Sequence, residues 1–226
     1  MSDSRDIILE TLKEAGQIPT KREAVPQDLD ERIARGLEKV TPKTQQGLIE
    51  QFQKELELVS GEFHRLKNAN AAADIVLEIM KQNGYEKITV TGENICQRIS
   101  DIMIKVDESI VCVDPLNLPY PERKELLAEV PIALVEASFG ITDIGALVFP
   151  YDDSQTSLPH FLSECVISVI SGKNLVPNQF DLFDKLPPEK AKNMVFIAGP
   201  SRTADIEKIL ILGAHGPRRL VVLMFD

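Results

Sequence analysis

The sequence predicts an α/β domain in which a mostly parallel sheet lies between layers of helices. Short apolar or β-branched runs recur along the chain, and several of them are apolar throughout instead of alternating with polar residues. Such runs are typical of strands that are covered on both faces. Amphipathic segments with helix start and stop signals lie between some of these runs. This order of elements indicates a three-layer α/β/α arrangement.

The first 41 residues are predicted to form an N-terminal helical arm, separate from an α/β domain over residues 42–226. Residues 5–15 carry apolar side chains at helical spacing and end at Gly16, and residues 29–37 carry only a thin apolar stripe. We expect the arm to dock on its own domain or on a neighbouring subunit, or to form a mobile tail. Its apolar stripe is the main sequence argument for a homo-oligomer or a partner surface.

Helices are predicted at four further places along the chain. Thr41 as cap and Pro42 at the first helical position indicate a helix whose buried face carries Leu48, Phe52, Leu56 and Val59. A second helix spans Ala72 to Met80 and ends at Asn83-Gly84, a turn dipeptide. Shorter helices are expected at residues 122–128 and after Asn178, which is a good N-cap residue.

The predicted strands are short, and turn residues bound them. Residues 62–66 indicate an edge segment because three of the five residues are charged or carry an imidazole. The remaining strands are expected at residues 87–90, 109–113, 131–135, 146–149, 165–170, 195–198 and 220–225.

A polar stretch near the carboxyl end is the strongest candidate for a site. The strand at residues 195–197 runs into Gly199-Pro200, after which Ser201 or Thr203 can cap a helix that continues to Leu212. A helix N-terminus after a strand favours anions. The candidate anion-binding residues are Ser201, Arg202, Thr203, Asp205 and His215. The alternative is that these residues only cap a helix and face solvent.

The same stretch carries a family resemblance. GPSRTADIEKILILGAHGPRRL, residues 199–220, closely resembles the carboxyl-terminal signature of the LUD-domain family, in particular its lactate-utilisation (LutC-like) branch. Looser similarity runs back through residues 139–149 to residues 61–65. The resemblance implies a fold similar to the ribose-phosphate isomerase and coenzyme A transferase group. It also implies a subunit of a cytoplasmic system that oxidises L-lactate to pyruvate, with iron–sulfur clusters in LutA-like and LutB-like partner proteins.

Two other groups of polar residues are possible parts of a site. Glu62 and His64 share one face of an extended segment and could orient each other for proton transfer, although an edge strand is often charged to block aggregation. Glu136 directly follows an apolar strand, where a site at the sheet edge would need an acid, and Asp143 lies nearby in the sequence. We therefore treat Glu136, Asp143 and His64 as candidate second-layer residues.

One segment departs from the pattern of the family. Where the family carries a glutamate-threonine-glycine-threonine run, this chain has Asp143-Ile144-Gly145-Ala146, so both threonine hydroxyls are missing. The departure puts in doubt any polar binding that those threonines provide. No recognised catalytic set or nucleotide-binding glycine motif occurs in the sequence, and paired acids at Asp152 and Asp153 are interpreted as a solvated loop.

Composition limits the classes of partner and cofactor. The chain has 226 residues, with 25 Lys and Arg against 35 Asp and Glu, and a net charge of −10 disfavours nucleic-acid binding. No apolar stretch approaches the roughly 20 residues that span a bilayer, and the amino terminus lacks signal-peptide features, so we expect a cytoplasmic protein. Three cysteines without a C-x-x-C pair predict no iron–sulfur cluster and no metal in this chain.

Three functions remain open from the sequence. The resemblance favours the lactate-oxidising subunit. An independent enzyme or sensor of the coenzyme A transferase-like fold, binding a small anion at Arg202, is the alternative. A third possibility is an assembly role in which the acidic surface and the arm hold other subunits together.

Overall fold

The structure is a computed structural model, and it describes residues 42, 44–151, 155–187, 193–204, 210–212 and 216–226. At residues 202–204 and 210–212 it describes the backbone alone. The predicted arm, residues 1–41, lies outside the described residues, so its helices and its boundary stay predictions. Within the described ranges, no helix is both long and apolar enough to cross a membrane.

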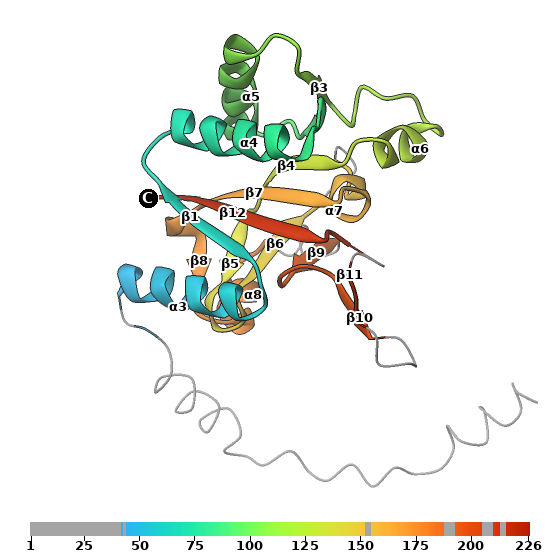
Figure 1. Cartoon of the computed structure of the whole chain (residues 1–226). Helices are drawn as coiled ribbons and strands as arrows, with labels where there is room; N and C mark the ends of the chain where they lie inside the picture. Colours follow the sequence, from blue (N-terminus) through green and yellow to red (C-terminus); the bar gives the residue numbers. More distant parts are fainter. Residues whose placement is uncertain (1–41, 43, 152–154, 188–192, 205–209, 213–215) are drawn as a thin grey trace, which may run out of the picture. The chain divides into compact units, whose positions relative to one another are not determined.

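A six-stranded parallel sheet forms the centre of the domain (Figure 1). Its strand order is β1-β12-β7-β4-β2-β3, and every neighbouring pair runs parallel. This sheet confirms the predicted α/β class, and the position of β1 confirms the predicted edge strand. The strands are β1 (Glu62–Leu66), β2 (Lys87–Val90), β3 (Val111–Val113), β4 (Ile132–Glu136), β7 (Cys165–Ser171) and β12 (Arg219–Phe225).

The central strands are buried on both faces, which explains their apolar runs. In β4, Ile132 and Leu134 belong to one hydrophobic cluster, whereas Ala133 and Val135 belong to another on the opposite face. Successive side chains of a strand point to opposite faces, so a sheet between two packed layers needs apolar residues at every position.

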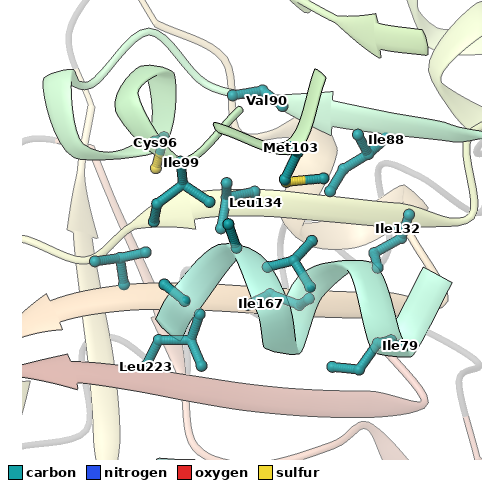
Figure 2. Packing of buried hydrophobic residues seen from close by; sticks show 14 of the residues in the cluster. Ile79, Ile88, Val90, Cys96, Ile99, Met103, Ile132, Leu134, Ile167 and Leu223 are labelled. Carbon is teal, nitrogen blue, oxygen red and sulfur yellow. The ribbon is translucent and has the colours of Figure 1, made fainter. Parts of the chain in front are cut away.

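Helices α4 (Ala69–Asn83) and α5 (Asn94–Val106) cover one face of this sheet. Figure 2 shows Ile79 of α4 and Cys96, Ile99 and Met103 of α5 packed against the strands. Helix α4 ends at Gly84, which has the left-handed φ of 69° that the predicted Asn83-Gly84 stop requires. Helix α5 was not predicted.

The opposite face is covered by helix α3 (Gln45–Leu58) and by a second, four-stranded sheet (Figure 1). The order of that sheet is β8-β5-β6-β9, and its outer face packs against α8 (Gln179–Lys185) through Leu182. Its strands are β5 (Phe139–Ile141), β6 (Ala146–Pro150), β8 (Leu175–Val176) and β9 (Met194–Ile197).

The remaining described elements are short. They are the helices α6 (Arg123–Ala128) and α7 (Leu158–Leu162), the 3-10 turns η1 (Thr142–Ile144) and η2 (Gly172–Asn174), and the strands β10 (Arg202–Ala204) and β11 (Leu210–Leu212). Helix α6 confirms the helix predicted at residues 122–128, whereas α7 was not predicted.

Side-chain caps fix where α8 and α3 begin. Asn178 accepts hydrogen bonds from the backbone N–H groups of Phe180 and Asp181, at 2.8 and 3.1 Å, and so confirms the predicted start of α8. The predicted start of α3 at Thr41-Pro42 is wrong by three residues. Thr44 is the cap, because its Oγ1 accepts a hydrogen bond from the backbone N–H of Gly47 at 3.0 Å.

The helix predicted from Ser201 or Thr203 to Leu212 is not formed at either of its described ends. Residues 202–204 form β10, which pairs antiparallel with β11, residues 210–212. Thr203 is therefore not a helix cap. The four consecutive apolar residues 209–212 have no helical alternation, and such a run suits a strand as well as a helix.

The strand before this hairpin also differs from its predicted place. The sequence places β9 as a strand that ends at the carboxyl edge of a parallel sheet. In the structure, β9 belongs to the four-stranded sheet and pairs antiparallel with β6. The polar turn that follows it therefore does not extend a strand of the six-stranded parallel sheet.

Candidate functional site

A pocket of about 630 Å³ opens at the carboxyl ends of three parallel strands. Thr91, Gly92 and Glu93 follow β2, Pro115 and Leu116 follow β3, and Glu136 is the last residue of β4. In open α/β sheets this edge is the usual place for ligands, because the loops that follow the strands converge there. The volume lies within the range of small-molecule and cofactor sites.

The second sheet and α7 supply the opposite wall of the pocket. Phe139 of β5 and Phe149 of β6 line it, followed by Tyr151 just beyond β6 and by His160 of α7. The pocket thus lies where the six-stranded parallel sheet meets the four-stranded mixed sheet, and it combines an apolar wall with a few ionisable groups.

Glu93 is placed at the first turn of α5 but does not cap it. It occupies the N-cap position, yet its side chain makes no capping hydrogen bond. Its Oε2 is buried and has no hydrogen-bond partner among the described residues. The positive end of the helix dipole favours a negative charge at this position. Glu93 therefore lines the pocket with a carboxyl group that does not cap α5, although its Oε2 has almost no accessible surface.

Glu136 lies near Glu93 and is held closer to its protonated form. Burial at the end of β4 raises the pKa of Glu136 above the usual value of a glutamate, and the negative charge of Glu93 raises it further. The pocket therefore contains two carboxyl groups that differ in environment, one partly desolvated at a strand end and one at a helix N-terminus.

Tyr151 and His160 form a hydrogen-bonded pair on the other wall. The Tyr151 hydroxyl oxygen lies 2.8 Å from Nδ1 and 3.0 Å from Nε2 of His160, so it can donate to whichever ring nitrogen is unprotonated. Burial raises the pKa of Tyr151, and the charge of Glu93 adds to this. Burial lowers the pKa of His160 to about 4. Both side chains are therefore neutral at pH 7.

Phe149 fixes the imidazole of His160 from the side. The two rings meet edge to face, with their centroids 4.3 Å apart, and His160 is only 2% exposed. An imidazole held between an aromatic ring and a tyrosine hydroxyl keeps one orientation, because rotation would break both contacts.

The described lining of the pocket carries no lysine or arginine. Its charged groups are the carboxyl groups of Glu93 and Glu136, since His160 is neutral at pH 7. The rest of the lining is apolar or carries neutral hydroxyl and amide groups. The described lining is therefore neutral to negative at pH 7.

A comparison with protein families identifies the domain that holds this pocket. The sequence profile of the LUD domain matches residues 49–225. The chain belongs to the LUD-domain family. This finding confirms the resemblance seen in residues 199–220, and the match extends it over both sheets and all of the pocket.

Relatives of the LUD domain include proteins with lactate-utilisation names. Lactate utilization protein C of Bacillus pumilus (strain SAFR-032) is 32% identical over 111 residues, which are 46% of either chain. YkgG of Escherichia coli (strain K12) is 25% identical over 163 residues, or 69% of either chain. The chain thus aligns with less than half the length of the first relative.

A solved structure shares the fold of this LUD domain. A DUF162 family protein from Deinococcus radiodurans aligns with a TM-score of 0.54 over 82% of this chain and 100% of its own. The sequence identity is 14%, so the match supports the fold alone.

Of the predicted site residues with described side chains, Glu136 alone lines the pocket of the LUD domain. His64 lies in the edge strand β1, and Glu62 beside it pairs with Arg219 and not with His64. Asp143 lies in η1, where burial and the charges of Glu55 and Asp181 raise its pKa.

The predicted anion site is only partly described. The backbone N–H of Ser201 donates to the carbonyl of Pro217 at 2.8 Å, and Ser201 does not line the pocket. Arg202 and Thr203 are described as backbone of β10, and Asp205 and His215 lie outside the described residues. A role of these residues in anion binding stays a prediction, but its basis in a helix N-terminus at Ser201 or Thr203 is lost.

Sequence reasoning missed Glu93, Tyr151 and His160 as site residues. Glu93 and Tyr151 each follow an apolar strand within three residues, which is the same signal that pointed to Glu136. His160 gave a weaker signal because it lies in a five-residue helix. The altered family segment, residues 143–146, contributes no residue to the described lining of the pocket.

Proposed function

We propose that this chain is a subunit of a lactate-utilisation system that oxidises L-lactate to pyruvate, and that its pocket binds a small molecule needed by that system. The membership in the LUD-domain family and the relatives named lactate utilization protein C support this proposal. The oxidation removes two electrons and two protons from lactate. In this proposal the electrons pass to iron–sulfur clusters of LutA-like and LutB-like partner proteins.

The observation that carries a binding role is the pocket at the carboxyl ends of β2, β3 and β4. Buried, hydrogen-bonded polar groups in a cavity orient a ligand because they offer few directions for a hydrogen bond. The Tyr151 hydroxyl and the His160 imidazole provide such a pair, 2.8 Å apart. Glu136, whose pKa is raised, can hold or release a proton beside the ligand.

The environment of the cysteines supports clusters in partner proteins instead of in this chain. Cys96 and Cys165 are buried in the core beside α4 and α5, and Cys112 packs against the same cluster. Burial raises the pKa of all three thiols, that of Cys165 to about 12. Iron–sulfur clusters need thiolates, so these three residues do not fit a cluster.

An enzyme or sensor that acts without partners is a second candidate, and the size of the pocket favours it. About 630 Å³ accommodates a molecule much larger than lactate. In this case the pocket binds a separate substrate or signal molecule. Lactate utilisation then depends on that molecule, either for its regulation or for its supply of reactants.

Growth on L-lactate tests the first candidate. A strain from which this gene has been deleted should fail to grow on L-lactate as sole carbon source, and the wild-type gene should restore growth. Tyr151→Phe should restore little growth, because it removes the hydroxyl that contacts His160 but keeps the ring. Glu108→Gln, at an exposed site outside the pocket lining, serves as control and should restore growth fully.

Two outcomes contradict the proposal. Normal growth of the deletion strain on L-lactate would remove the metabolic role. Full restoration by Tyr151→Phe, together with full restoration by His160→Gln at equal protein levels, would remove the pocket from that role. Purification of the tagged full chain from lactate-grown cells should also recover proteins with iron–sulfur absorption, and their absence would favour the second candidate.

A further inference from the structure

The charge of the described pocket lining argues against an anionic ligand. Glu93 and Glu136 are close enough that the charge of Glu93 raises the pKa of Glu136. No described lining residue supplies a compensating lysine or arginine. A carboxylate or phosphate entering the pocket would meet like charge in a partly desolvated site, where electrostatic repulsion is stronger than in water. A positively charged group would meet attraction from both carboxylates.

The carboxyl group of Glu93 lines the pocket and does not cap the helix that follows it. Its Oε2 is buried without a partner, and its position at the start of α5 is not used for capping. Its carboxyl group adds negative charge to the pocket lining, and a charge-assisted N–H to carboxylate hydrogen bond is stronger than a neutral one.

The remaining lining determines the other part of the ligand. Side chains that are wholly apolar cover much of the wall between the two sheets, and they accept no hydrogen bonds. They are Pro115, Leu116, Val135, Phe139, Phe149 and Leu186. A ligand that fills the pocket therefore needs an apolar body next to its charged end.

We propose that the pocket binds a molecule with a cationic nitrogen group, of the amine, amidine or guanidine type, on an apolar body, and that the nitrogen group donates hydrogen bonds to Glu93 and Glu136. This inference rests on the proposed function insofar as it takes the pocket as the functional site. The cation compensates the negative charge of the two carboxyl groups that line the pocket, and the apolar body covers the aromatic wall.

Three probes of nearly equal shape test the charge preference. Benzamidinium carries a cationic amidine, benzamide a neutral amide and benzoate a carboxylate, all on the same ring. Binding to the purified full chain is measured by titration calorimetry at about pH 8, because Glu136, whose pKa is raised, ionises more fully as the pH rises. We expect benzamidinium to bind with a millimolar or lower Kd, benzamide more weakly, and benzoate not at all. Binding of benzoate as tight as that of benzamidinium, or no binding of benzamidinium at millimolar concentration, would overturn the proposal.

Two variants test the assignment to the carboxylates. Glu93→Gln and Glu136→Gln should each weaken benzamidinium binding by at least about tenfold, because each removes one charged acceptor. Glu108→Gln should bind as the wild type does. If one of the two variants fails to fold, as judged by its circular dichroism, the other carries the test. The proposal is overturned if every one of these variants that folds binds benzamidinium as tightly as the wild type.

The failure of this inference is distinguishable from failure of the proposed function. If a folded Glu93→Gln chain loses benzamidinium binding and still supports growth on L-lactate, that result supports the proposed class of ligand and contradicts the metabolic role of the pocket. If growth on L-lactate depends on Tyr151 and the wild-type chain binds benzoate more tightly than benzamidinium, the pocket has the proposed metabolic role but not the proposed class of ligand.

Discussion

Arg219 and Glu62 form two parallel hydrogen bonds between β12 and the edge strand β1. Nε of Arg219 lies 2.6 Å from Oε1 of Glu62, and Nη2 lies 2.8 Å from Oε2. The pair is bidentate, which fixes both side chains, but its side chains are 35% and 41% exposed, so solvent screens the charges. Because Arg219 holds both carboxylate oxygens of Glu62, Glu62 does not orient His64, which is the pairing that the sequence predicts.

A double-mutant cycle should give a small coupling energy for this pair. We expect Glu62→Gln and Arg219→Lys to lower the free energy of unfolding by roughly 0.5 to 1 kcal/mol each, with a coupling of similar size. The comparison is a cycle at Arg65 and Asp226, which form a more exposed pair and should couple more weakly. Denaturant unfolding measures both cycles. A stronger coupling at Arg65–Asp226 would contradict the argument from exposure.

Gly145 should not tolerate a side chain. It has a φ of 59°, and an added Cβ would lie 2.4 Å from the backbone nitrogen of Leu56 in α3. Because strain and a clash with backbone add together, we expect Gly145→Ala to lower the free energy of unfolding by about 3 kcal/mol or more. Gly84→Ala is the matched control, since Gly84 has a φ of 69° and nothing within 4 Å, and it should cost about 1 kcal/mol. Equal costs would show that α3 moves away freely.

His160 should make the fold sensitive to acid. Burial lowers its pKa to about 4 in the folded chain, whereas an unfolded histidine titrates near 6.5, so the unfolded state binds the proton more readily. The stabilising contribution is complete above about pH 6.5 and is lost as the pH falls to about 4. We expect a loss on the order of 3 kcal/mol, measured by denaturant unfolding at several pH values. A His160→Gln variant should lack this part of the pH dependence, and an unchanged profile would contradict the assignment.

Glu136 should act in the opposite sense. Its pKa is raised, so the folded state binds the proton more readily than the unfolded state, and its contribution to stability is lost as the pH rises through the raised pKa. Glu136→Gln removes the ionisable group. We expect this variant to gain stability relative to the wild type as the pH rises from about 4 to 7. If the stability of Glu136→Gln relative to the wild type is instead greatest at acid pH, the pKa of Glu136 is not raised, and its environment is not desolvated.

The strands of the parallel sheet could be predicted because their pattern records burial directly. In β7 and β12, every residue from Val166 to Ile170 and from Leu220 to Met224 is buried, so the runs are continuous and turn residues bound them. Helix α5 carries the same information at helical spacing, in Cys96, Ile99 and Met103. It was missed because it lacks a capping side chain at its start and is rich in isoleucine, which has only moderate helix propensity.

The hairpin β10–β11 could not be predicted from local signals. Ser201 and Thr203 are good caps in any sequence, but the pairing of residues 202–204 with residues 210–212 depends on contacts that local propensity does not record. Glu136 could be predicted as a site residue because it directly follows an apolar strand in the sequence. The contact of Tyr151 with His160 was not predictable, because it depends on how the chain returns through α7.

Strand β12 lies between β1 and β7, although β1 is the first strand of the sheet along the chain and β12 is the last. The contact that joins Glu62 to Arg219 spans 157 residues of sequence. During translation, β1 is therefore synthesised long before β12, its neighbour in the described sheet, and closing so long a loop is slow. Until β12 emerges, the hydrogen-bonding edges of β1 and β7 stay open to chaperones, proteases and other nascent chains, so premature termination anywhere before residue 219 leaves a chain that cannot complete its sheet.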